Sequence, residues 1–309
     1  MCGNLFGESI KKSLEINIYA DEIMAKVCPY TGHEWHYIGL VVEDCNNSFI
    51  PDLIAERFRN NFDKGSPFYK KNNRAVHWAD ISSADEKFIC KRWFDYILNP
   101  SKSGNKFYCS ILGLNNSYLN KAEFDNESDF NSKYNRFFRS SIKYALKCFF
   151  GDNEITILNL YHEQGQQQHH SYFPWHVIYK LQAEEPKFIF RTDKIEFLQK
   201  DHTIDERSNV IQVCDCMLGA ITNIIHGVEE SNRSKYRAEL LDVMLPLVRK
   251  MTRESKNKNS SFGHYNRIMI SFFPKEYTEI DDLKRNINQF YTVRPLKYED
   301  DISGQGQLF

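Results

Sequence analysis

Residues 14–22, LEINIYADE, form the stretch of sequence that decides the fold. Ile16, Ile18 and Ala20 alternate with polar or aromatic residues, and this period of two is typical of a β-strand. The strand runs directly into two acids, Asp21 and Glu22. Because a pleated strand points successive side chains to opposite faces, it directs only one of the two acids into a given site, and we expect that acid to be Asp21.

Composition indicates a globular protein with a substantial core. The chain has 309 residues, of which 41% are hydrophobic and 26% are charged. A net charge of −1 argues against a protein that coats nucleic acid by bulk charge, but leaves room for a local basic face. The eight cysteines include no CxxC pair, and no signal peptide or long apolar span is visible. We therefore expect reduced thiols, a cytoplasmic location and no membrane partner.

The remaining periodicity predicts an α/β protein with a central mixed sheet flanked by helices. The first strand is expected to pair with residues 37–42 as an antiparallel hairpin. Further strands are expected at residues 106–114, 154–161, 187–191, 195–198 and 267–273, and helices at 49–62, 84–98, 134–150, 172–181 and 210–226. The predicted organisation is a domain at 1–227, a basic helical C-terminal annex at 228–302 and a flexible tail at 303–309.

The helix at residues 210–226 carries a polar stripe on an otherwise apolar surface. Gln212, Asp215, Gly219 and Thr222 follow one another at spacings of three, four and three, which places them on one helix face. A buried carboxylate needs a cation, a metal ion, a hydrogen-bond donor or a proton, so Asp215 should have such a partner. Gly219 is expected to permit close approach of the helix to a sheet.

Two further acids are placed to join Asp21 and Asp215. Glu163 ends the strand at 154–161, and strand ends of α/β sheets are where sites are built. Asp205 precedes the helix in the segment DERSN, where it fits a helix cap or a ligand. Four such carboxylates suit Mg²⁺ or Mn²⁺ rather than zinc.

Four segments of this chain resemble one known family. They are IYADE at 18–22, VHWADI at 76–81, the strand that enters His162 and Glu163, and DERSNVIQVCDCMLGA at 205–220. At these segments the chain is similar to the domain of unknown function 3800 family, whose members look like ribonuclease-H-like nucleases. The resemblance covers residues 14–227 and implies a ribonuclease-H-like sheet.

The resemblance also implies site residues. It places Asp21, Glu163 and Asp215 on the family's acidic, metal-binding positions and Asp205 on a further catalytic one. The chain departs from the family pattern after the first acidic pair, at Ile23 and Met24, and before His77, at Ala75 and Val76. The second acid of a ribonuclease H site is therefore open, with Glu22, His77 and Asp80 as the candidates.

The function expected from these residues is a metal-dependent nuclease that hydrolyses DNA or RNA with two Mg²⁺ or Mn²⁺ ions. One ion would activate water and the other would stabilise the leaving oxygen, at a separation of about 4 Å. The alternative is a non-catalytic nucleic-acid-binding or sliding-clamp adaptor protein with a degenerate site. Two weaker alternatives are a zinc site at His162, Glu163, His169 and His170, and a thiol nucleophile at Cys214 or Cys216.

Two C-terminal features suggest partners. Residues 232–258 have an excess of Lys and Arg over Asp and Glu, and Arg249, Lys250 and Arg253 are candidates for contacts with backbone phosphates. The tail ends in QGQLF, where Gln305, Leu308 and Phe309 resemble a bacterial sliding-clamp-binding peptide. A clamp partner would favour DNA over RNA as substrate.

Overall fold

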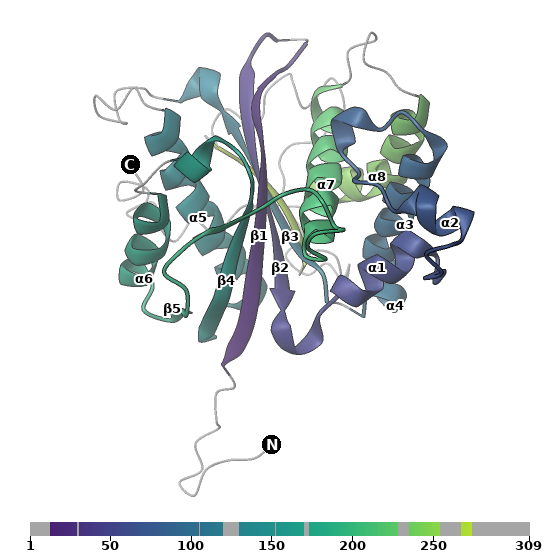
Figure 1. Ribbon diagram of the computed structural model, residues 1–309. Coiled ribbons are helices and arrows are strands. Elements are labelled where there is room, and N and C mark those ends of the chain that lie inside the picture. The colour runs from purple at the N-terminus through teal and green to yellow at the C-terminus, as the bar shows by residue number, and fades with distance from the viewer. Residues whose placement is uncertain are drawn as a thin grey trace, which may run out of the picture.

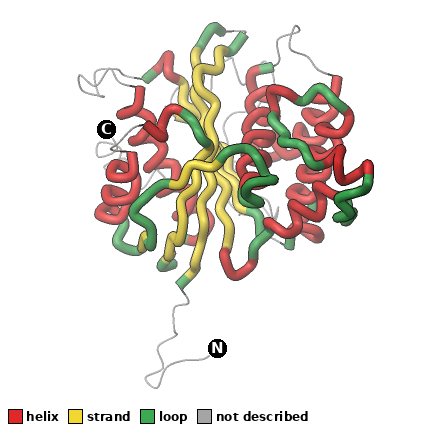
Figure 2. The backbone as a smooth tube through the Cα atoms, viewed as in Figure 1, coloured by secondary structure: helices red, strands yellow, loops and turns green. Residues whose placement is uncertain are grey.

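A mixed β-sheet forms the centre of the protein, as the computed structural model shows (Figures 1 and 2). The structure describes residues 13–29, 31–104, 106–119, 130–151, 153–169, 173–227, 235–253 and 267–273. Within these residues the sheet has the strand order β5-β4-β1-β2-β3-β7, and β6 also pairs with β4. The strands are β1 Leu14–Val27, β2 Glu34–Asp44, β3 Tyr108–Asn115, β4 Ile155–Glu163, β5 Phe188–Phe190, β6 Glu196–Leu198 and β7 Ile268–Phe273. The α/β prediction is confirmed.

The first two strands form the antiparallel hairpin that the sequence predicts, and β4 runs parallel to β1. Strand β1 is longer than expected. It continues past Asp21 and Glu22 to Val27, with an irregularity between Ile23 and Lys26. The two acids therefore lie inside the strand, just beyond Ala20, where the pairing of β1 with β4 ends.

Helices cover both faces of the sheet (Figure 1). Their bounds are α1 Ile50–Phe58, α2 Pro67–Asn72, α3 Ala84–Leu98, α4 Pro100–Ser103, α5 Phe130–Phe150, α6 Lys180–Glu184, α7 Ser208–His226 and α8 Lys235–Arg253, with a π-helix at Trp175–Tyr179 before α6. Helix α1 is shorter than the expected 49–62, because Arg59 adopts a left-handed conformation that ends it. Helix α3 begins at a capping box between Ser83 and Glu86, as its sequence predicts.

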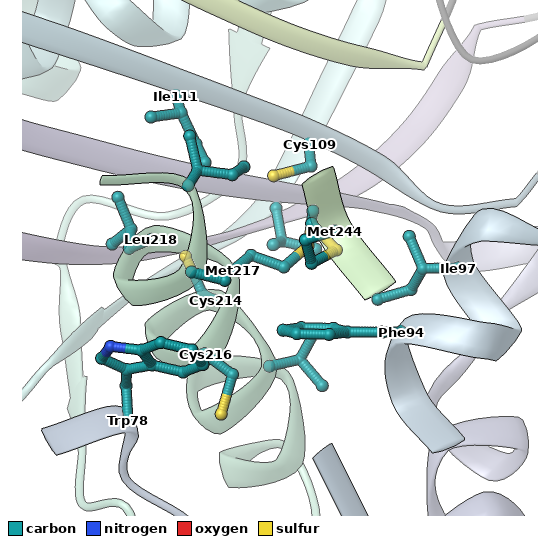
Figure 3. Close-up of a cluster of buried hydrophobic side chains, with 14 of the residues drawn as sticks. Trp78, Phe94, Ile97, Cys109, Ile111, Cys214, Cys216, Met217, Leu218 and Met244 are labelled. Atoms are coloured by element: carbon teal, nitrogen blue, oxygen red, sulfur yellow. The ribbon is translucent and has the colours of Figure 1, made fainter. Parts of the chain in front are cut away.

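The core consists of two clusters separated by the sheet. On one face, α7 packs against β1 and β2, with α1, α3 and α8 outside it. On the other face, α5, the π-helix and α6 cover Ile16, Ile18 and Ala20 of β1. Figure 3 shows part of the first cluster, in which the ring of Trp78 lies against α7. Strand β1 is thus buried on both sides: the neighbouring residues Ile18 and Tyr19 point to opposite faces of the sheet, and both are buried.

The described residues after position 227 share this core. Helix α8 buries Leu240, Met244 and Val248 against α7 and α3. Strand β7 pairs in parallel with β3 at the edge of the sheet. These two elements therefore extend the same layered structure.

Helix α7 is the one described helix that is long and apolar enough to cross a membrane by length and composition. In this fold, 89% of its apolar stretch is buried inside the protein. Its apolar character thus matches its place between the sheet and α8.

Candidate functional site

Three predicted acids converge on one lysine. The ammonium nitrogen of Lys200 lies 2.6 Å from Glu163 Oε1, 3.4 Å from Asp21 Oδ2 and 3.5 Å from Asp215 Oδ1. Lys200 and Asp21 are buried, with side-chain exposures of 9% and 1%. Among the described residues, these are the acids that pair with Lys200. The sequence therefore identified three carboxylates that the fold brings together.

The sheet positions Asp21 and Glu163. Their strands pair in parallel up to Ala20 and His162, so the next residues of both strands lie side by side where that pairing ends. Asp21 Oδ1 accepts the backbone N–H of Glu22 at 2.7 Å, and Oδ2 then faces Lys200. The local backbone thus fixes which oxygen of Asp21 enters the site.

A glycine brings α7 to the sheet. Gly39 of β2 lies opposite Asp21 of β1 in the antiparallel register. A Cβ atom at Gly39 would lie 2.8 Å from Leu218 and 2.9 Å from Cys214 Sγ. The missing side chain lets α7 approach β2 closely, and this approach places Asp215, the neighbour of Cys214, beside Asp21.

The polar stripe of α7 binds the backbone of the segment at 76–78. The N–H of Val76 donates to Gln212 Oε1 at 2.8 Å, and the N–H of Trp78 donates to Asp215 Oδ2 at 2.8 Å. Asp215 Oδ1 is then left to face Lys200. Two segments that carry the family resemblance, VHWADI and the start of α7, are therefore in direct contact.

Gly219 serves a different purpose from the one expected. We predicted that it allows α7 to approach the sheet, but a Cβ atom at this position would lie 2.0 Å from Trp78 Cγ. Gly219 makes room for the indole ring of Trp78, and the approach to the sheet occurs at Gly39 instead.

Gln212 joins three parts of the site. Its Oε1 also accepts a hydrogen bond from Arg57 Nη2 at 2.6 Å, and its Nε2 donates to the backbone carbonyl of Lys200 at 3.2 Å. Arg57 is fully buried and donates in addition to Asn209 Oδ1 and to the carbonyl of Asn72. One side chain thus fixes α7, the segment leading to Trp78 and the backbone of Lys200 relative to one another.

The electrostatics of the cluster follow from burial. Burial and the neighbouring Glu163 carboxylate raise the pKa of Asp21 well above its usual value, against the effect of Lys200. Burial alone would raise the pKa of Glu163, but its contacts with Asp21 and with the Lys200 ammonium lower it. Burial also raises the pKa of Asp215. Although burial opposes its charge, Lys200 has a raised pKa because three carboxylates surround it. Burial thus disfavours the charge on Asp21 and Asp215, and the Lys200 ammonium compensates it in part.

The candidates for the second acid lie in three different places. Glu22 points to the opposite face of β1, where its Oε2 lies 3.5 Å from His162 Nε2. His77 borders the site, with Nδ1 3.8 Å from Asp215 Oδ2. Asp80 is exposed in a short turn. Of the three, His77 is the residue that the structure places against the carboxylate cluster.

Asp205 has a partner outside the cluster. Its carboxylate pairs with the guanidinium of Arg207, with Arg207 Nη2 2.6 Å from Asp205 Oδ2, and it accepts the backbone N–H of Arg207 at 2.9 Å. This hydrogen bond forms the turn that precedes α7. Helix α7 itself has Arg207 at its N-cap position and no side-chain cap hydrogen bond, so Asp205 stabilises the preceding turn and lies outside the carboxylate cluster.

The oxygen donors fit a hard divalent cation, although the present arrangement is closed around an ammonium group. Asp21 Oδ2 is buried without a hydrogen-bond partner, and the three carboxylates supply the oxygen ligands that Mg²⁺ and Mn²⁺ prefer. In the described part of the chain, no three His, Cys, Asp or Glu side chains form a ready metal site. Lys200 Nζ lies between the carboxylates, so an ion would need it to move.

Lys200 is the site residue that sequence reasoning missed. It comes two residues after β6, and β6 pairs with β4 at the position of Glu163. A lysine that follows a strand is usually solvated, and the pairing that brings Lys200 beside Glu163 joins segments that are distant in the sequence, so no sequence pattern indicated its role.

Several other expectations fall where side chains are not described. The side chains of Arg249, Lys250 and Arg253, the residue His170, and the tail residues Gln305, Leu308 and Phe309 lie outside the described part. Cys214 and Cys216 are buried, and burial raises the pKa of both thiols. Such thiols are poor nucleophiles.

Comparison with known proteins assigns no family or function to this site. No protein-family model, no curated protein and no solved structure matches the chain. The site is therefore defined by its own residues: Asp21, Glu163 and Asp215 around Lys200.

Proposed function

We propose that the protein is a Mg²⁺- or Mn²⁺-dependent nuclease that hydrolyses phosphodiester bonds in DNA or RNA. The observation that carries the proposal is the convergence of Asp21, Glu163 and Asp215 from two strands and a helix. Clustered carboxylates repel one another unless a cation or a proton compensates them, so a buried group of three favours a cation-dependent function.

The carboxylate oxygens that face Lys200 are the ones that such a cation would bind. Asp21 Oδ1 and Asp215 Oδ2 accept backbone N–H groups, and this leaves Asp21 Oδ2 and Asp215 Oδ1 directed into the site together with Glu163. A bound ion would supply Lewis-acid activation of water and stabilisation of the leaving oxygen. The backbone hydrogen bonds hold both aspartates in position before an ion binds.

The fold supports the proposal. The order β3-β2-β1-β4-β5, with β2 antiparallel to both of its neighbours and β4 parallel to both of its own, is compatible with a ribonuclease-H-like sheet. The resemblance to the domain of unknown function 3800 family proposes the same fold from the sequence. Nucleic-acid contacts through Arg249, Lys250 and Arg253, clamp binding through the tail and a cytoplasmic location are further parts of the proposal.

The test is cleavage of labelled single- and double-stranded DNA and RNA with Mg²⁺ or Mn²⁺. Asp21→Asn and Asp215→Asn each remove one ligand charge and keep the side-chain shape. Each is expected to reduce cleavage by about 100-fold or more, because metal-site residues contribute at least this much. The control is Asp95→Asn on α3, which removes an exposed acid with the same chemistry. Cleavage by both site variants at the parent rate would refute the assignment.

Lys200 favours a second candidate, a nucleic-acid-binding or sliding-clamp adaptor without catalysis. A lysine that pairs with all three carboxylates gives them a permanent counter-ion within the chain. In this case the protein retains nucleic acid in a filter-binding assay, and EDTA changes neither binding nor the integrity of the nucleic acid. Cleavage that EDTA abolishes would exclude the adaptor.

A further inference from the structure

We propose that Lys200 is an exchangeable counter-ion, so that a divalent ion enters the site by displacing its ammonium group. The inference rests on the metal site of the proposed function and adds a residue that limits the affinity for the metal. It starts from the position of Lys200 Nζ, within 3.5 Å of a carboxylate oxygen of Asp21, Glu163 and Asp215.

An ion and the ammonium group compete for the same oxygens. Mg²⁺ binds carboxylate oxygens at about 2.0–2.1 Å, which is shorter than any of the distances to Lys200 Nζ. Two cations among three carboxylates at such separations repel each other strongly in a buried site. Lys200 is 9% exposed, so water does little to screen this repulsion. Binding of an ion therefore requires the ammonium group to leave.

Hydrogen bonds hold the backbone around Lys200, so displacement requires movement of its side chain alone. Its carbonyl accepts Gln212 Nε2, and the preceding carbonyl, of Gln199, accepts Ser208 Oγ at 2.6 Å. The ammonium group ends a flexible four-carbon chain whose rotamers change without movement of this anchored backbone. Displacement therefore leaves the carboxylates and α7 in place.

The displacement lowers the apparent affinity for the ion. Three contacts to Lys200 must break before the ion gains its own, and this cost is subtracted from the intrinsic binding free energy. Removing the charge of Lys200 should consequently tighten metal binding. A residue that helped to hold the ion or its water would have the opposite effect.

The test compares Mn²⁺ binding to the wild type, Lys200→Met and Lys200→Arg by isothermal titration calorimetry, without nucleic acid. Lys200→Met removes the charge and keeps an unbranched apolar chain, whereas Lys200→Arg keeps the charge and is the matched control. We expect the Kd for Mn²⁺ to fall at least ten-fold in Lys200→Met and to remain within about three-fold of wild type in Lys200→Arg. An equal or higher Kd in Lys200→Met would overturn the inference.

Thermal unfolding covers the case in which Lys200→Met folds poorly without an ion. Saturating Mn²⁺ should then raise its Tm by more than it raises the Tm of the wild type, because the ion replaces the missing cation. An equal or smaller rise would refute the displacement. The Mn²⁺-binding results can be told apart from the result of the nuclease test. Tight Mn²⁺ binding by Lys200→Met without cleavage by the wild type would support the displacement and reject the nuclease, and no binding by any variant would reject both.

Discussion

Gly219→Ala tests whether the contact between α7 and Trp78 supports the carboxylate cluster. A Cβ atom at position 219 would lie 2.0 Å from Trp78 Cγ, the atom at which the ring joins its own Cβ, and 2.1 Å from Trp78 Cδ1. The ring is 6% exposed and packed in the main core cluster, so it has little room to move aside. The backbone N–H of Trp78 also holds Asp215, so a shift of Trp78 reaches the site.

The expected magnitude is a balance of two effects. Overpacking a filled core costs about 1–3 kcal/mol. Replacing a helical glycine by alanine contributes about 1 kcal/mol in the opposite direction. We therefore expect Gly219→Ala to lower the free energy of unfolding by up to about 2 kcal/mol. In a Trp78→Ala background the clash is absent, so the same substitution should stabilise the protein by about 0.5–1 kcal/mol.

The assay is a double-mutant cycle measured by urea unfolding of the wild type, the two single variants and the double variant. A coupling free energy of about 2 kcal/mol between the two positions is expected. A coupling near zero would show that the indole ring does not meet α7 at Gly219. Mn²⁺ titration of Gly219→Ala is a second measurement, and we expect weaker binding than in the wild type because Asp215 loses its fixed orientation.

Two further predictions concern stability. Gln212→Leu removes the acceptor of Arg57 Nη2 and of the Val76 N–H, so urea unfolding should show a loss of about 3 kcal/mol or more. An unchanged midpoint would contradict the network. Burial, partly opposed by Glu22 and Glu34, lowers the pKa of His36 from 6.5 to about 4. Because the folded-state pKa is the lower one, the stabilising contribution of neutral His36 is complete above pH 6.5 and is lost as the pH falls to about 4, at most about 3 kcal/mol. His36→Gln should flatten the pH dependence of the unfolding free energy in this range, and an unaltered slope would reject the assignment.

The sequence by itself determined the elements and the acids. The period of two in residues 14–22 identified β1, because a strand buried on both faces still places its side chains alternately. The spacing of Gln212, Asp215 and Gly219 identified the face of α7 that contacts the segment at 76–78, since polar side chains on a buried apolar helix need hydrogen-bond partners. The convergence of Asp21, Glu163 and Asp215 followed from acids at positions that strands and a buried helix direct into the protein.

Tertiary structure alone decided the partners of those acids. Lys200 enters the cluster because β6 pairs with β4 at the position of Glu163, and this pairing between distant segments leaves no periodic pattern in the sequence. The partner of Gly219 is Trp78 rather than the sheet, because the close contact with β2 is made at Gly39. Glu22 and Asp21 are adjacent in the chain but lie on opposite faces of β1, with His162 and Lys200 as their respective partners. The cation that compensates each carboxylate is decided by distances of a few ångströms. These distances are set only when the sheet and α7 pack together.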